Sequence, residues 1–282
     1  MTEIECRPST VFAGRVDEDA AAAFALATND ANPRYQDGRA VPPLYTGAMI
    51  LEAQVEAQIS GIGHDDVTGW TIGVHGQHDV RFHQPVRPGA HLRYWGHTYS
   101  ARQTKGGVLV AQLISVTDLD GQLLVEHLWS NFFAGGSIAT EYGPPLPDHS
   151  FAERFRDRLV GTRAVPVHRD QAYRYAGVSG DHVGHAMDDE IARSEGFAGK
   201  ILQGMCTFGL ASGALVDMTA DGDPDRIARL AVRFAAPARP SADIVVRVYA
   251  ADRTESGARA YAFEAEQDGV FVLKHGRVEL RD

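Results

Sequence analysis

The sequence has few of the features that mark secreted, membrane or nucleic-acid-binding proteins. Its 282 residues include only two cysteines, Cys6 and Cys206, too few for a disulfide framework or a thiolate metal site. No apolar run approaches the roughly 18 residues of a membrane span, and residues 1–10 lack the apolar core of a secretory signal. The formal net charge of −10 argues against nucleic acid as a partner. We therefore expect a cytoplasmic protein that binds neither nucleic acid nor membrane.

The sequence also lacks the motifs of several common sites. It has no glycine-rich phosphate loop and no Gly-x-Ser-x-Gly nucleophile elbow. The first half is rich in histidines, but their irregular spacing matches no zinc-binding pattern, and we interpret them as strand and loop residues: His75, His78, His83, His91 and His97. We therefore expect no metal site and no separate cofactor.

What the sequence does contain is an internal repeat. Residues 80–89 read Val-Arg-Phe-His-Gln-Pro-Val-Arg-Pro-Gly, and residues 232–241 read Val-Arg-Phe-Ala-Ala-Pro-Ala-Arg-Pro-Ser. Each copy is followed by three segments whose alternation and β-branched or aromatic residues predict strands. These segments are His91–Ser100, Val108–Thr117 and Leu123–Phe133, then Ile244–Ala250, Ala258–Glu266 and Val270–Glu279. Asp120-Gly121 and Asp268-Gly269 are typical of the hairpin turns that join such strands.

Each copy of the repeat is preceded by a helical candidate. Apolar residues recur near helical spacing in Gly47–Ser60 and in Gly204–Met218. Each half therefore predicts an α+β unit, in which a central helix precedes a meander of long strands. The stretch Glu141–His149 contains Tyr-Gly-Pro-Pro-Leu-Pro and is typical of a linker. We predict two units, residues 1–148 and 149–282.

One segment of the second half has a recognisable signature. Residues 179–188 read Ser-Gly-Asp-His-Val-Gly-His-Ala-Met-Asp, and Gly196-Phe197 and Ile201-Leu202-Gln203-Gly204 follow. This pattern resembles that of the MaoC-like dehydratases and (R)-specific enoyl-CoA hydratases (hydratase 2). The resemblance implies a double hotdog, two units in which a curved antiparallel sheet wraps a central helix. It also implies reversible hydration of trans-2-enoyl-CoA to (R)-3-hydroxyacyl-CoA, or dehydration of a 3-hydroxyacyl thioester, with CoA or an acyl carrier protein as part of the substrate.

The same resemblance suggests site residues. In the family an aspartate and a histidine hold the reacting water, and Asp181 stands at the place of the aspartate. The histidine is expected five residues later, where this sequence has Ala186, and His185 lies one residue early. We expect His185 to reach the water if the turn at Gly184 bends differently, because glycine is permissive in φ. The resemblance further implies that the Gly204 amide binds the thioester carbonyl and that Ser212 lines the acyl site, for which close helix packing is the alternative.

The first half carries a degenerate copy of this signature. Residues 28–37 read Thr-Asn-Asp-Ala-Asn-Pro-Arg-Tyr-Gln-Asp, so Asp30 matches Asp181 while Tyr35 stands where the histidine belongs. A tyrosine with a reference pKa near 10 is a poor base at neutral pH. We therefore expect a non-catalytic first half, with a hybrid site that uses Asp30 or Tyr35 as the alternative.

Other functions stay open at this point. A thioesterase of the same fold would also use a helix-end amide and a carboxylate, and the missing histidine favours a binding or partner subunit for acyl thioesters. Four arginines are candidate partners for the phosphate groups of CoA: Arg226, Arg229, Arg233 and Arg239. A structural role is the alternative for Arg233 and Arg239. Two units in one chain already form a pseudo-dimer, so both a monomer and a homodimer are compatible with the sequence.

Overall fold

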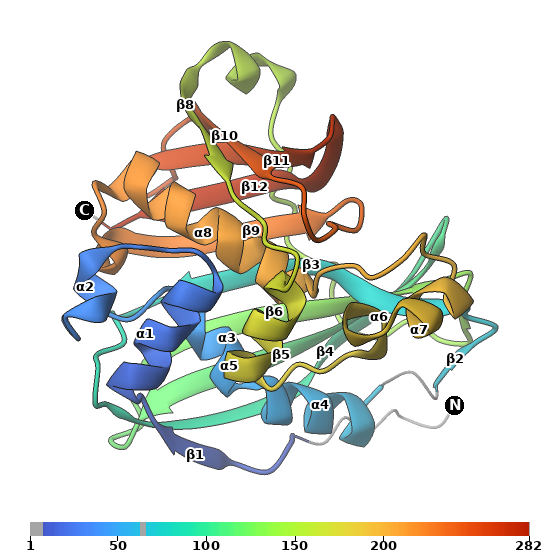
Figure 1. Ribbon diagram of the computed structural model, residues 1–282. Coiled ribbons are helices and arrows are strands. Elements are labelled where there is room, and N and C mark those ends of the chain that lie inside the picture. The colour runs from blue at the N-terminus through green and yellow to red at the C-terminus, as the bar shows by residue number, and fades with distance from the viewer. Residues whose placement is uncertain (1–7, 63–65, 282) are drawn as a thin grey trace.

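A computed structural model describes residues 8–62 and 66–281, and most of its strands join one antiparallel sheet (Figure 1). The ten strands follow the order β1-β4-β5-β6-β3-β9-β12-β11-β10-β8, so each half of the chain supplies one side of the sheet. The first half contributes β1 (Phe12–Arg15), β3 (Ile72–Phe82), β4 (His91–Thr104), β5 (Gly107–Asp118) and β6 (Leu123–Ala134). The second half contributes β8 (Leu159–Val165), β9 (Ile227–Phe234), β10 (Ile244–Ala250), β11 (Ala260–Gln267) and β12 (Val270–Leu280). A separate pair joins β2 (Val67–Thr68) to β7 (Ser137–Ile138).

The two halves meet where β3 pairs with β9. These strands carry the beginnings of the two repeat copies, and Val80 lies opposite Leu230. Asp79 and Arg229 form an ion pair across this junction with 2.6 Å between oxygen and nitrogen, and Asp79 is 2% exposed. Arg229 also contacts Glu279 at 3.1 Å. Because a buried ion pair is costly to break, this contact fixes the register of the two halves.

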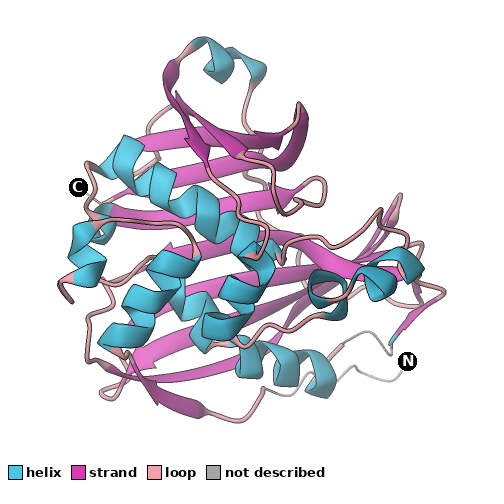
Figure 2. Ribbon diagram, viewed as in Figure 1, coloured by secondary structure: helices cyan, strands magenta, loops and turns pink. Residues whose placement is uncertain are grey.

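The longer helices lie over one face of the sheet (Figures 1 and 2). The first half has α1 (Glu18–Ala27), α2 (Pro33–Gln36), α3 (Tyr45–Met49) and α4 (Leu51–Ser60). The second half has η2 (Glu153–Asp157), α5 (Gln171–Ser179), α6 (Gly184–Met187), α7 (Asp189–Ser194), α8 (Gly204–Ala220) and η3 (Pro224–Arg226). Helix α8 is buried along nearly its whole length, as expected for the central helix of a wrapped sheet.

The helix predicted over Gly47–Ser60 differs in detail. It begins earlier and is divided into α3 and α4, because Ile50, with ψ of 1°, leaves the α-helical region. The helix predicted over Gly204–Met218 is present and extends to Ala220. Within the described ranges, no helix is both long and apolar enough to cross a membrane.

The predicted strands and turns are confirmed with small shifts of their ends. Strands β11 and β12 are joined by the two residues Asp268 and Gly269, both with positive φ (51° and 77°), as in a type I′ hairpin. The predicted boundary at residue 148 lies in the segment between β7 and η2. The architecture is the double hotdog of the α+β class that the repeat and the resemblance predict.

Candidate functional site

Two cavities meet at the beginning of α8, between the halves of the chain. The first, here called the polar cavity, has a volume of about 520 Å³, and the second, the apolar cavity, about 370 Å³. Polar side chains of α4, β6 and the second-half motif line the polar cavity, among them Gln54, Gln58, Asn131, Asp181, Glu195 and Gln203. The apolar cavity is lined chiefly by aromatic and small residues, among them Phe132, Phe197, Phe234, Ala236 and Pro237. Five residues line both cavities and define their junction: Ile72, Val74, His75, His185 and Gly204.

Asp181 lines the polar cavity directly after helix α5. That helix ends at Gly180, whose left-handed φ of 72° turns the chain toward the cavity. One carboxylate oxygen of Asp181 accepts a hydrogen bond from the Val183 amide at 3.3 Å. Burial raises the pKa of Asp181, because the charged form loses solvation, and this amide and the nearby histidines only partly oppose the shift. Asp181 can therefore hold a proton more readily than a solvated aspartate.

His185 lines both cavities and is held by a carboxylate. It belongs to the single turn of α6 and is 8% exposed. Its Nδ1 lies 2.8 Å from Oε2 of Glu195, and the edge of its ring meets Phe197 at 5.5 Å between centroids. If Nδ1 carries the proton toward Glu195, Nε2 is left as the nitrogen with a free lone pair.

The neighbouring residues of α6 explain this placement. Ala186 is fully buried in the main core and lines neither cavity, whereas His182 is exposed. Gly184 has no positive φ and begins an ordinary helical turn. Its role is close packing, because a Cβ there would stand 2.9 Å from Cγ2 of Ile191. The contact draws α6 against α7, the helix that leads to Glu195.

Gly204 begins α8 and lies at the junction of the two cavities. The first amide of this turn with an internal partner is that of Thr207, which donates to the Gln203 carbonyl at 3.0 Å, so the Gly204 amide precedes the internal ladder. Gln203 links the helix to the loop that carries Asp181, because its Nε2 donates to the Asp181 carbonyl at 2.9 Å and to the Ala172 carbonyl at 3.1 Å. Ser212 is buried two turns further along and lines neither cavity.

Three residues at this site carry no signal of their role in the sequence. Glu195 is the C-cap residue of α7, and nothing in the neighbouring sequence marks it as a partner of His185. His75 is a strand histidine, as the sequence predicts, yet it also lines both cavities. Gln203 is a neutral side chain whose partners lie on other elements. No local pattern marks these roles, because each depends on a contact that only the fold creates.

The first-half copy of the motif lies at a different place. Asp30 lines a third cavity of about 470 Å³, together with Arg34, Arg163 and residues of α8. Its Oδ1 accepts the Asn32 amide at 3.0 Å, and burial raises its pKa to about 6. Tyr35 is 1% exposed and its hydroxyl has no partner among the described residues. Neither Asp30 nor Tyr35 lines the polar or the apolar cavity, so the structure does not assemble the hybrid site.

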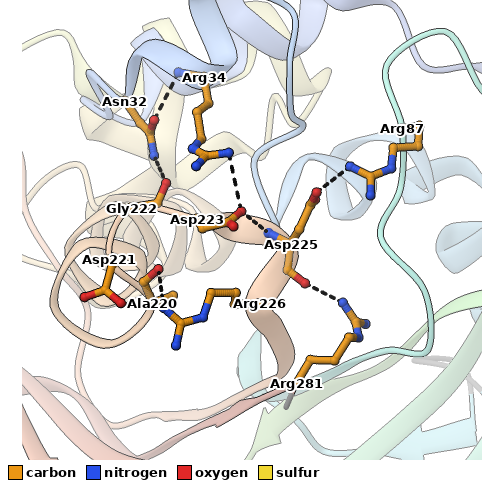
Figure 3. Close-up of polar contacts among 10 residues, drawn as sticks. All are labelled: Asn32, Arg34, Arg87, Ala220, Asp221, Gly222, Asp223, Asp225, Arg226 and Arg281. Carbon is orange, nitrogen blue, oxygen red and sulfur yellow. Dashed lines mark hydrogen bonds and ion pairs between the residues drawn. The ribbon is translucent and has the colours of Figure 1, made fainter.

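Polar contacts tie this first copy to the end of α8 (Figure 3). The Asn32 side chain donates to the Gly222 carbonyl at 2.8 Å, and Arg34 pairs with Asp223 at 3.7 Å. The carboxylate of Asp225, in the helix η3 that follows, accepts a hydrogen bond from Arg87. The copy thus holds the two halves together.

Three of the four candidate arginines for CoA form ion pairs with carboxylates of this chain. Arg229 pairs with Asp79 and Glu279 at the junction of the halves. Arg226 pairs with Asp221, and Arg239 pairs with Asp268 at 2.5 Å. Arg233 is exposed on β9.

Comparisons with known proteins show what this chain is similar to in sequence and in fold. Residues 151–267 match the family model described as MaoC like domain. The chain is 24% identical over 235 residues to a probable enoyl-CoA hydratase 2 of Dictyostelium discoideum, which covers 83% of this chain and 76% of that protein. It is 28% identical over 215 residues to 3-hydroxyacyl-thioester dehydratase Y of Mycobacterium tuberculosis, covering 73% and 72%. A MaoC-like dehydratase of Phytophthora capsici has a similar fold, with a TM-score of 0.81, 21% identity and coverage of 98% and 96%.

Proposed function

We propose that the chain is a MaoC-like protein of the double-hotdog fold and that it is a hydro-lyase acting on acyl thioesters. The reaction is the reversible hydration of trans-2-enoyl-CoA to (R)-3-hydroxyacyl-CoA, or the same chemistry on a carrier-bound thioester. The observation that carries the proposal is the placement of Asp181, His185 and Gly204 around one pair of joined cavities. The names of the relatives from Dictyostelium and Mycobacterium support the same reaction class.

The environments of the two acid–base groups suggest different roles. His185, with Nδ1 bound to Glu195, presents Nε2 as a proton acceptor for water. Asp181, whose carboxyl group lines the same polar cavity as His185, is the candidate for the proton transfer at the α-carbon. In the hydration direction the water oxygen bonds to the β-carbon while His185 takes its proton, and Asp181 protonates the α-carbon. The proton returns from His185 to Asp181 after release of the product, so the enzyme is regenerated without a cofactor.

The thioester carbonyl needs a partner during this reaction. Addition at the β-carbon moves negative charge onto the carbonyl oxygen, which a hydrogen-bond donor at a helix N-terminus stabilises. The Gly204 amide lies at the beginning of α8, at the junction of the two cavities. Its position allows the carbonyl to lie at the junction while the acyl and pantetheine portions occupy different cavities.

The test is a hydration assay with crotonyl-CoA and longer enoyl-CoAs, followed at the absorbance of the conjugated thioester. Wild type, Asp181→Asn and His185→Ala are compared. We expect both variants to lose about 10²–10⁴-fold in rate, as is typical for removal of an acid–base group. Loss in the first with full activity in the second would overturn the role of His185. Release of free CoA without hydration would indicate a thioesterase, and absence of turnover at every chain length would favour a binding subunit.

A further inference from the structure

A chain of three histidines, of which His78 and His127 are buried and His75 is partly buried, leads from helix α3 to the junction of the cavities. Nε2 of His75 lies 3.1 Å from Nδ1 of His78, and Nε2 of His78 lies 3.0 Å from Nδ1 of His127. Nε2 of His127 lies 3.0 Å from the Thr46 hydroxyl. His78, His127 and Thr46 are at most 1% exposed, and of these four residues only His75 lines the polar or the apolar cavity. The contacts join successive rings, and the described ranges contain no group of three or more His, Cys, Asp or Glu side chains that could hold a metal ion.

A β-bulge makes this chain possible. Side chains three positions apart in a regular strand point to opposite faces of the sheet. The pairing of β3 with β6 shifts between His75 and Gln77, and Gly76 is the extra residue. The bulge therefore turns His75 and His78 toward one another. Trp129 stacks on the His75 ring with 4.5 Å between centroids and 8° between planes, which fixes the ring at the cavity wall.

The histidines of the chain are neutral at physiological pH. Burial lowers the pKa of His75 and of His127 to about 3, and it lowers that of His78 as well, because the protonated forms lose their solvation. A backbone hydrogen bond with Gln77 opposes the shift in the pKa of His75 only in part. A neutral imidazole with so low a pKa cannot act as a proton store. It can still donate one hydrogen bond, as the neutral catalytic histidine of triosephosphate isomerase does to its substrate carbonyl.

Each neutral ring has one N–H, so the chain has two possible directions. In one direction Thr46 donates to His127, His127 donates to His78, and His78 donates to His75. The last free N–H is then on Nδ1 of His75. In the other direction all donors point away from the cavity, and Nδ1 of His75 carries only a lone pair.

Nδ1 of His75 lies beside the start of α8. A Cβ added to Gly204 would stand 2.8 Å from this nitrogen and 2.6 Å from the His75 Cβ. The imidazole of His75 and the first residue of α8 therefore lie close together at the junction of the cavities. A carbonyl oxygen that accumulates negative charge there would favour the direction in which Nδ1 carries the proton.

We propose that His75 is a second hydrogen-bond donor to the thioester carbonyl, beside the Gly204 amide, and that His78, His127 and Thr46 hold the tautomer that makes it one. This inference rests on the proposed hydration of acyl thioesters. His75 would be a catalytic residue, and the other three would be positioning residues. Loss of the His75 donor would lower kcat, because its hydrogen bond to the carbonyl oxygen strengthens as negative charge develops on that oxygen.

The first test is kinetic and uses enoyl-CoA hydration. His75→Phe keeps a flat ring between its aromatic neighbours but removes the donor, and we expect kcat to fall about 10²–10³-fold with little change in KM. His78→Phe removes the partner that fixes the tautomer, and we expect a smaller fall in kcat, about tenfold, from a mixture of tautomers. His91→Gln, at an exposed position of β4, is the matched control and should behave as wild type. An active wild type with an unimpaired His75→Phe variant would overturn this inference and leave the proposed function intact, whereas an inactive wild type would overturn both.

The second test does not depend on turnover, and its first measurement needs only the wild-type protein. Nitrogen-15 NMR of the histidine rings in the wild-type protein distinguishes Nδ1–H from Nε2–H tautomers and from the protonated ring. We expect His75, His78 and His127 all to be neutral Nδ1–H tautomers from pH 5 to 8. In His78→Phe the His75 signal should shift toward the other tautomer. An Nε2–H tautomer at His75 in the wild type would overturn the proposal, whatever the activity.

Discussion

Asp30 and Asp181 occupy equivalent positions in the two halves, but they line different cavities. Each follows a helix, α1 or α5, and each precedes a single helical turn, α2 or α6. Both carboxyl groups have a raised pKa because of burial. Only Asp181, however, shares a cavity with a histidine and with the beginning of the long helix α8. Two aspartates of similar local structure thus differ in the side chains that line their cavities.

The residue four positions after each aspartate shows how the copies diverged. In the first copy it is Arg34, which pairs with Asp223 in the loop after α8. In the second copy it is His185, which is oriented by Glu195 and lines both cavities. The residue five positions after the aspartate is buried in both copies, as Tyr35 and as Ala186. The first copy thus makes contacts between the halves, and we propose that the chemistry takes place at the second copy.

The largest expected difference between the copies is in activity. Asp181→Asn should reduce the rate of enoyl-CoA hydration by about 10²–10⁴-fold, because the amide cannot exchange the proton. Asp30→Asn is the matched control, since it makes the same change at the equivalent position, and it should keep the wild-type rate. Steady-state kinetics on both proteins measures the contrast. Equal losses in the two variants would show that the first-half copy takes part in the reaction.

Glu195 allows a second test of what distinguishes the copies. It contacts His185 in the second copy, whereas Arg34, the equivalent of His185 in the first copy, pairs with Asp223. Glu195→Gln keeps the size of the side chain but removes the charge that fixes the His185 proton on Nδ1. We expect kcat to fall by about 10²-fold with a small change in KM. The matched control is Glu190→Gln, an exposed residue of the same helical segment. If kcat were unchanged in Glu195→Gln, the histidine would be oriented by other means.

How far the sequence could predict the site depends on the range of the contacts involved. The repeat and the periodicity predict the helix–meander order of both halves, and the turn at Asp268-Gly269 is local chemistry. The cap of α7 is equally local, because the Asp188 side chain accepts the amides of the two residues Glu190 and Ile191 that closely follow it. These features lie within a few residues of one another. The pattern of local residues is therefore sufficient to predict them.

The chemistry of the cavity junction depends on contacts between distant residues. His75 comes to Gly204 only because β3 pairs with β9 and a bulge turns the ring. The contact of His185 with Glu195 spans two short helices, whose packing depends on Gly184. Register alone, which places Ala186 at the family's histidine position, gives no information on where the adjacent side chain points. The sequence names Asp181, His185 and Gly204 as candidates, whereas the contacts that Glu195 and His75 make with them depend on the fold.

The third prediction concerns stability and its dependence on pH. The pKa of Asp30 is about 6 in the folded protein, above its ordinary value of 3.8. The folded state therefore binds a proton more tightly, so the stabilising contribution is complete below pH 3.8 and is lost as the pH rises to about 6. Asp30→Asn should raise the free energy of unfolding by about 2–3 kcal/mol above pH 7 and by little near pH 4. Denaturant titrations at the two pH values measure the difference, and a gain that is the same at both would contradict a buried, titrating carboxylate.

The smallest expected effect lies at Tyr35, the residue that replaces the family histidine in the first copy. Its hydroxyl is buried and has no partner among the described residues, so Tyr35→Phe removes a polar atom that gains nothing from folding. We expect the free energy of unfolding to rise by up to about 1 kcal/mol, with the hydration rate unchanged. Thermal and denaturant unfolding, together with the enoyl-CoA assay, check both parts. A loss of activity would contradict the division of labour between the copies, because it would give Tyr35 a role in the reaction even though it lines neither cavity of the proposed site.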